Sequence, residues 1–125
     1  MSFTVDIARF AIDTKSSLDQ AARAVKISLF NGVIRDTRVD TGRLRGNWMT
    51  TTGSPSTEVS DRVDKIERGT DGGKAQAEVK ANVRGATVDY LTNNLSYSEV
   101  YEEKDGMMAK NMARISRSLK ESSRG

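Results

Sequence analysis

Residues 39–48 read VDTGRLRGNW, and this short stretch separates two different patterns of apolar residues. Asp40 and Thr41 can hydrogen-bond to nearby backbone amides, and Gly42 can adopt a positive φ angle, so the stretch predicts a sharp turn. After the turn, Trp48 and the three threonines at 50–52 indicate a strand over about 44–52. We therefore expect the chain to change from helix to sheet at this point.

Before the turn, the apolar residues recur at helical spacing and predict an amino-terminal helix over about 3–35. Polar residues at 13–17 make a kink or a break an alternative, but we expect one continuous helix. A continuous helix of ~30 residues would be ~45 Å long, whereas a compact globule of this size is about 35–40 Å across. One end should then protrude, and a second copy of the chain is the simplest cover for its apolar stripe. The stripe consists of Ile7, Ala11, Leu18, Ala22, Val25, Leu29 and Val33.

After the turn, glycines and the only proline indicate a long loop over 53–74, in which Val59, Val63 and Ile66 are spaced for a short helix. Strict alternation over 75–84 predicts a strand that packs against the first helix, and a further strand is expected over 87–93. A turn and a short helix follow over 94–103, and a last helix over about 106–120 has Asp105 as its expected cap. The sequence thus predicts a single α+β domain over 1–125. In it, a small antiparallel β-sheet, within about 44–93, is packed by a long N-terminal helix and a C-terminal helix.

Composition removes many familiar kinds of catalytic site. The 125 residues include no cysteine and no histidine, which excludes disulfides, thiolate nucleophiles, Ser-His-Asp triads and the usual zinc ligands. No apolar run approaches the ~20 residues that span a bilayer, and the first residues lack the pattern of a signal peptide. We expect a protein that is not an enzyme, holds no cofactor or metal, has no membrane partner and is made in the cytoplasm.

Two other functions remain open from the residues alone. Asp40-Thr41-Gly42 is the triplet that carries the catalytic aspartate of aspartic proteases, which can act as homodimers. The flanking helical patterns instead favour a turn in which Asp40 pairs with Arg43 or Arg45 or caps backbone amides, since the protease triplet lies in an all-β barrel. The net charge of +3 and the cluster of Arg35, Arg38, Arg43 and Arg45 leave a nucleic-acid-binding accessory protein as the other alternative. A solvated surface or a subunit contact is the favoured explanation of the cluster.

The order of the features resembles the tail-completion and neck proteins that join head to tail in long-tailed bacteriophages. The resemblance covers nearly the whole chain. It is sharpest in VDTGRLR at 39–45 with Trp48, and in NNLSY at 93–97 followed by Glu102 or Glu103. The chain departs from the family pattern at Ser96, where proline is common, and at Tyr97-Ser98, where the family often has Tyr-Ala.

The resemblance implies a virion structural protein that forms a homo-oligomeric ring, with sixfold symmetry to match a tail tube. The implied partners are portal, adaptor or head-closure proteins on one side and a tail terminator or tail-tube protein on the other, with double-stranded DNA passing through the lumen. A tail terminator or a head-closure ring is the neighbouring alternative. The expected interface residues are Ile7, Ala11, Leu18, Val25, Arg43, Arg45, Trp48, Tyr97 and Tyr101.

Overall fold

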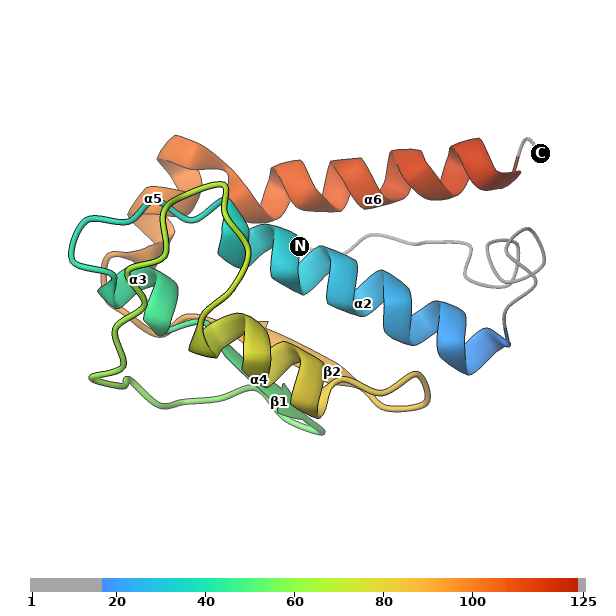
Figure 1. Cartoon of the computed structure of the whole chain (residues 1–125), viewed down its shortest axis with the longest axis horizontal. Helices are drawn as coiled ribbons and strands as arrows, with labels where there is room; N and C mark the ends of the chain where they lie inside the picture. Colours follow the sequence, from blue (N-terminus) through green and yellow to red (C-terminus); the bar gives the residue numbers. More distant parts are fainter. Residues whose placement is uncertain (1–16, 124–125) are drawn as a thin grey trace.

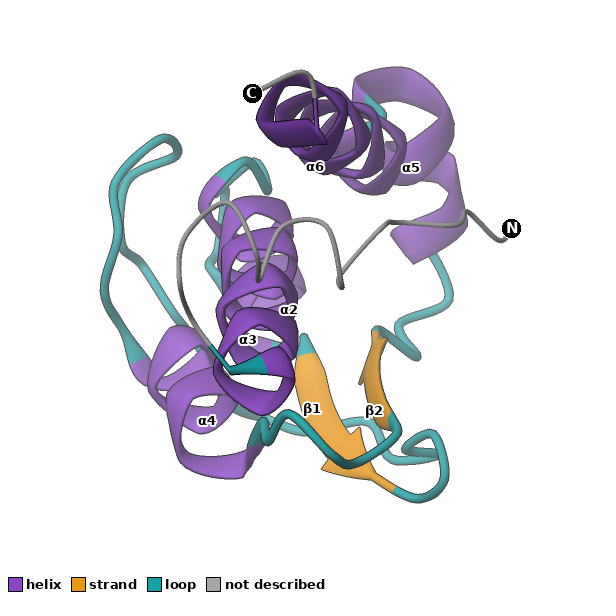
Figure 2. Cartoon of the chain, turned by 90° about the vertical axis from the view of Figure 1, so that its right-hand side faces the viewer, coloured by secondary structure: helices purple, strands orange, loops and turns teal. Residues whose placement is uncertain are grey.

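The computed structural model describes residues 17–123, and their helices pack in layers on a small sheet. Figures 1 and 2 show α2 in the middle of the molecule, with α6 on one side of it and α4 and the two strands on the other. The chain therefore has the α+β fold that the sequence predicts. The elements are α2 (Leu18–Arg35), α3 (Arg43–Gly46), β1 (Met49–Thr52), α4 (Lys74–Asn82), β2 (Asp89–Thr92), α5 (Ser98–Asp105) and α6 (Met107–Ser123).

A capping box marks the start of α2. The Ser17 hydroxyl accepts a hydrogen bond from the Gln20 amide at 3.1 Å, and the Gln20 side chain accepts one from the Ser17 amide at 3.3 Å. The predicted helix is confirmed from Leu18 to Arg35, but a single continuous helix over 3–35 is wrong, because Ser17 has a non-helical ψ of 157° and caps α2. The residues before it, with Ile7 and Ala11, lie outside the described residues. Eighteen helical residues span about 27 Å, so α2 itself fits within a domain of this size.

The apolar stripe of α2 is largely covered within the same chain. Phe30, Val33 and Ile34 belong to the main core, whose other buried members are Trp48, Ala75, Val79, Val83 and Met107. Val25 packs instead against Ile115 and Leu119 of α6. Over the described residues a second copy is thus not needed to cover the stripe, except at Leu18, which is 57% exposed.

Gly32 allows α6 to approach α2 closely. A Cβ atom at Gly32 would lie 2.1 Å from Asn111 Oδ1 and 2.6 Å from a guanidinium nitrogen of Arg114. Asn111 is buried and donates hydrogen bonds to Asp36 Oδ2 at 2.9 Å and to the Met107 carbonyl at 2.7 Å. The Asn111 side chain is therefore held in place and cannot easily yield to a methyl group.

The predicted strand over 75–84 is wrong, because these residues form α4. Its sequence, KAQAEVKAN, alternates apolar and polar residues, yet Ala75, Val79 and Val83 are also four residues apart and lie on one helical face. Alanine is the best helix former, which favours the helix. The expected contact with the first helix is confirmed, since Arg23 of α2 donates to the carbonyls of Lys80 and Val83, each at 3.1 Å.

The sheet has two strands. β1 pairs antiparallel with β2, from Met49 opposite Thr92 to Thr52 opposite Asp89. The strand predicted over 87–93 is confirmed, but only the second half of the strand predicted over 44–52 forms, because residues 43–46 make the helical turn α3. The short helix expected at 59–66 is absent, since these residues have no regular secondary structure and pack against α3 and the residue before it.

The last two helices follow the prediction with one correction. α5 and α6 match the helices expected over 94–103 and 106–120. Asp105 does not cap α6, because it is the last residue of α5 and pairs with Arg38. Glu102 takes the capping role, accepting hydrogen bonds from the amides of Met108 at 2.8 Å and Ala109 at 3.2 Å. No helix within residues 17–123 has both the length and the apolar composition needed to cross a bilayer.

Substituting Gly32→Ala should destabilise the protein by about 1–3 kcal/mol, because the added methyl group overlaps the fixed Asn111 side chain. The usual gain in helix propensity from glycine to alanine, about 1 kcal/mol, has the opposite sign and should be outweighed. Urea denaturation followed by circular dichroism measures the change. Ser118→Ala, at an exposed position of α6, is the control and should alter stability by less than about 0.5 kcal/mol. Equal or greater stability of Gly32→Ala would contradict the close packing of α2 and α6.

Candidate functional site

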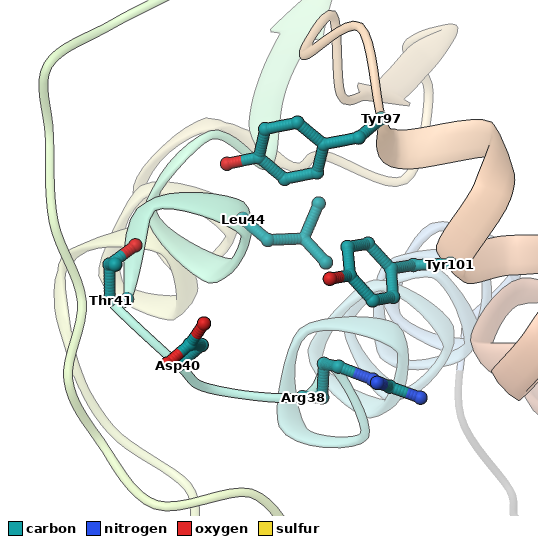
Figure 3. A pocket seen from close by; sticks show the side chains of 7 residues that line it. Arg38, Asp40, Thr41, Leu44, Tyr97 and Tyr101 are labelled. Carbon is teal, nitrogen blue, oxygen red and sulfur yellow. The ribbon is translucent and has the colours of Figure 1, made fainter.

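The two segments that stand out in the sequence, 39–45 and 93–97, meet at one end of the fold. Asn93 Nδ2 donates to the Leu44 carbonyl at 2.8 Å. Asn94 Nδ2 donates to the carbonyls of Ser56 and Glu58, at 2.8 and 3.0 Å, and so ties the second segment to the long loop. Between the segments lies a surface pocket of about 180 Å³, lined by Arg38, Asp40, Thr41, Gly42, Leu44, Tyr97 and Tyr101 (Figure 3).

Oxygen atoms surround the opening of this pocket. Figure 3 shows the hydroxyls of Tyr97 and Tyr101 and the side-chain oxygens of Asp40 and Thr41 facing a common space, with Leu44 between the two rings. Asp40 is exposed and forms no ion pair with the described residues. The pocket therefore offers hydrogen-bond acceptors and one uncompensated negative charge above an apolar floor.

Ring contacts and an ion pair fix the tyrosine wall of the pocket. The rings of Tyr97 and Tyr101 are edge to face, with centroids 5.8 Å apart, and the Arg38 guanidinium carbon lies 4.7 Å from the Tyr101 centroid. Arg38 also forms two hydrogen bonds to Asp105, at 2.7 and 2.6 Å. The Arg38 charge is therefore compensated, and Figure 3 shows its guanidinium directed away from Asp40.

The ion pair between Arg38 and Asp105 shifts the pKa of both groups. Hydrogen bonding from Arg38 lowers the pKa of the Asp105 carboxyl, against the opposing effect of burial, and the charges of Arg38, Arg68 and Lys110 add to the lowering. Hydrogen bonding to Asp105 raises the pKa of Arg38. Both groups are thus charged throughout the neutral range.

Arg45 has a structural role as an anchor for the long loop. Its side chain is fully buried, and Nη2 donates to the carbonyls of Thr70 at 2.9 Å and Gly72 at 3.0 Å. Its Nε atom lies 3.4 Å from Asp64 Oδ2, which is also buried. The expected pairing of Arg45 with Asp40 is therefore wrong, because Asp64 from the loop takes that place.

Two glycines of the 39–48 stretch let the loop dock closely on α3. Gly42 has φ +85°, its carbonyl accepts a hydrogen bond from the Asp64 amide at 2.9 Å, and a Cβ there would lie 2.7 Å from the Asp64 carbonyl oxygen. A Cβ at Gly46 would lie 2.3 Å from the Arg62 carbonyl oxygen. Asn47 then exchanges two hydrogen bonds with the Ser60 backbone, at 2.8 and 3.0 Å. Most of this stretch therefore builds the fold.

The expected interface residues have different positions in the structure. Arg45 and Trp48 are buried, and Trp48 Nε1 donates to the Thr37 hydroxyl at 2.8 Å, so both belong to the interior. Val25 is covered by α6. Four remain accessible, the exposed Leu18 and Arg43 and the half-buried Tyr97 and Tyr101, while Ile7 and Ala11 lie outside the described residues.

The arginine cluster does not form a positive surface patch. Arg35 lies 3.6 Å from Asp36 and 3.8 Å from Asp71, Arg38 is paired with Asp105, and Arg45 is buried beside Asp64. Only the Arg43 guanidinium in this cluster has no partner among the described residues. Within residues 17–123, no three His, Cys, Asp or Glu side chains are placed to hold a metal ion.

Sequence reasoning missed the residues that position this site. Arg38 and Asp105 are 67 residues apart, and no local pattern indicates that they meet. The amides of Asn93 and Asn94 were noted only as part of the family pattern. Two adjacent asparagines directly after a strand are a signal for side-chain to backbone hydrogen bonds, which is the role they have here.

Replacing Asp64 by alanine should destabilise the protein by about 3–5 kcal/mol, because it leaves the Arg45 charge buried without its partner. Amides of the loop, including Asp64 to Thr70, should also exchange hydrogen faster. Urea denaturation and hydrogen exchange measure the two effects. Lys65→Ala, at the exposed neighbouring position, should change neither, and wild-type protection of the loop in Asp64→Ala would contradict the anchoring role.

The Arg38–Asp105 pair predicts a loss of stability in acid. The folded-state pKa of Asp105 is depressed, so its contribution is present above the unfolded pKa, about 4, and is lost as the pH falls through the lower folded value. Asp105→Asn should be less stable than wild type at pH 7, and the difference should shrink between about pH 4 and pH 2. Thermal melts across that range measure it. Asp61→Asn, which removes an exposed carboxylate without an ion pair, is the control, and a constant difference for Asp105→Asn would rule out this linkage.

Comparison of the chain with protein-family models, with curated proteins and with solved structures finds no match. Two features of the chain therefore bear on its function. They are the residues of 39–48 and 93–97 in which the resemblance is sharpest, and the pocket that residues of both segments line.

Proposed function

We propose that this chain is a neck protein of a tailed bacteriophage, of the tail-completion type, which forms a ring between the head connector and the tail tube. The observation that carries the proposal is the hydrogen bond from Asn93 to the Leu44 carbonyl. It joins the two segments in which the resemblance is sharpest, so the family pattern corresponds to one structural unit at one end of the molecule. That unit holds both the long loop and the pocket.

A ring subunit needs two unlike surfaces that meet head to tail. The end that carries the pocket and the loop is one candidate surface. The outward face of α6 is another, because α6 packs on α2 with its opposite face (Figure 1). The near balance of 20 basic and 17 acidic residues suits a lumen through which double-stranded DNA passes without tight binding. We propose that the ring has sixfold symmetry and lies in the neck of the virion. Its partners are portal or adaptor proteins on the head side and a terminator or tail-tube protein on the tail side.

The neighbouring alternatives share this geometry. A tail terminator caps the tail tube, whereas a head-closure ring sits on the connector, and both are small ring-forming proteins. The particle that retains the chain when head and tail are separated distinguishes them. The other two functions have less support, because the arginines expected to contact nucleic acid are used in internal pairs and Asp40 lies on an exposed turn outside any β-barrel.

Deleting the gene should leave filled heads and full-length tails that do not join. The reason is that a missing neck layer removes the contact surface between two structures that assemble separately. Electron microscopy of lysates counts joined and unjoined particles, and mass spectrometry of purified virions detects the protein at a few copies per particle. Supplying the wild-type gene in trans is the control and should restore joined particles. Infectious particles from the deletion, or finished virions that lack the protein, would remove the proposal.

A further inference from the structure

The chemistry of the pocket indicates a particular kind of occupant. Its opening presents the Asp40 carboxylate, two phenol hydroxyls and the Thr41 hydroxyl, and at about 180 Å³ it is smaller than the ~300–1,000 Å³ of typical small-molecule sites. One side chain that is positively charged and carries several donors would match this set of acceptors. A guanidinium has five N–H donors, stays charged and packs well against aromatic rings, so arginine fits best.

Most arginines of the chain are already engaged. Among residues 17–123, only Arg43 and Arg117 have guanidinium groups without a hydrogen bond or ion pair to another described residue. The others bind carboxylates or carbonyl groups within the chain; they are Arg23, Arg35, Arg38, Arg45, Arg62, Arg68, Arg84 and Arg114. Arg43 and Arg117 are therefore the candidates for a contact with a second copy.

The positions of Arg43 and Arg117 show which of the two suits a contact within a ring. Arg43 lies on the same turn as Asp40 and Thr41, so its insertion into a neighbour's pocket would pair one patch with itself and close at two copies. Arg117 lies on α6, ten residues or roughly 15 Å beyond Met107. It is two positions, about 200° around the helix, from the buried Ile115, and so points away from α2. A contact through Arg117 joins two different surfaces, which is what a ring requires.

We propose that Arg117 of one copy inserts into the pocket of the next copy and pairs there with Asp40, between the hydroxyls of Tyr97 and Tyr101. This inference rests on the proposed ring. It assigns the pocket a second copy of this chain as its occupant, and it explains why the Asp40 carboxylate and the Arg117 guanidinium are both left without partners in the single chain. Opposite charges on the two surfaces would also orient the copies head to tail.

The test compares assembly of wild type, Asp40→Arg, Arg117→Asp and the double variant that carries both changes. Sedimentation velocity over a range of concentrations gives the concentration at which half of the chains are assembled. Asp40→Arg and Arg117→Asp should each raise this half-assembly concentration about tenfold or more, because a like-charge contact replaces an attractive one. The double variant should return it most of the way to the wild-type value. Arg43→Asp and Lys80→Asp, at exposed positions beside the pocket and on α4, are the matched controls and should stay within about twofold of wild type.

Because Asp40 and Arg117 are exposed, the variants should keep wild-type thermal stability, which melts can verify. Normal assembly of both single variants, or a double variant no better than the single ones, would overturn the pairing while leaving the ring intact. An effect of Arg43→Asp without one of Arg117→Asp would overturn it in favour of a two-copy contact. A wild-type chain that stays monomeric at every concentration would overturn the pairing too. The proposed function is removed only by the two outcomes of the gene deletion, infectious particles without the gene or finished virions that lack the protein.

Discussion

The buried contact between Arg45 and Asp64 is the constraint on which the long loop and α3 depend. Two charges removed from water are costly, and the Nε–Oδ2 distance of 3.4 Å is too long for a strong hydrogen bond. The cost is offset because Arg45 also binds the carbonyls of Thr70 and Gly72. The loop over 53–73 has no regular secondary structure, so such bonds from side chains to its backbone are what hold it. Without them α3, and with it the pocket floor at Leu44, would lose its cover.

The other wall of the pocket depends on a second, more exposed ion pair. Asp105 ends α5, and its two hydrogen bonds to Arg38 fix α5 against the end of α2. Tyr97 and Tyr101 come from the start of α5 and the residue before it, so their positions follow from this attachment. The pocket is therefore shaped by one buried and one half-exposed charge pair, and its polar opening is left for something outside the chain.

The sequence predicts those parts of the fold that local patterns determine. α2 and α6 follow from helical spacing, and α5 and β2 lie where turn residues divide the chain. α4 was mistaken for a strand because Ala75, Val79 and Val83 satisfy both periods at once. α3 and the irregular segment at 59–66 depend on contacts with each other, chiefly Gly42 with Asp64, which no local pattern contains. Tyr97, Tyr101 and Arg43 are accessible, as the interface role predicted for them requires, whereas the Arg38–Asp105 pair could not be found without the fold.

The structure also separates the motif residues that build the fold from those that remain for function. Gly42, Arg45, Gly46 and Asn47 hold the loop, and Asn93 ties the second segment to the first. In this chain, most residues of the two segments therefore serve the fold. Specificity for a neighbour then has to come from positions that the fold leaves free. Exposed positions of this kind at or beside the pocket are Asp40, Thr41 and Arg43.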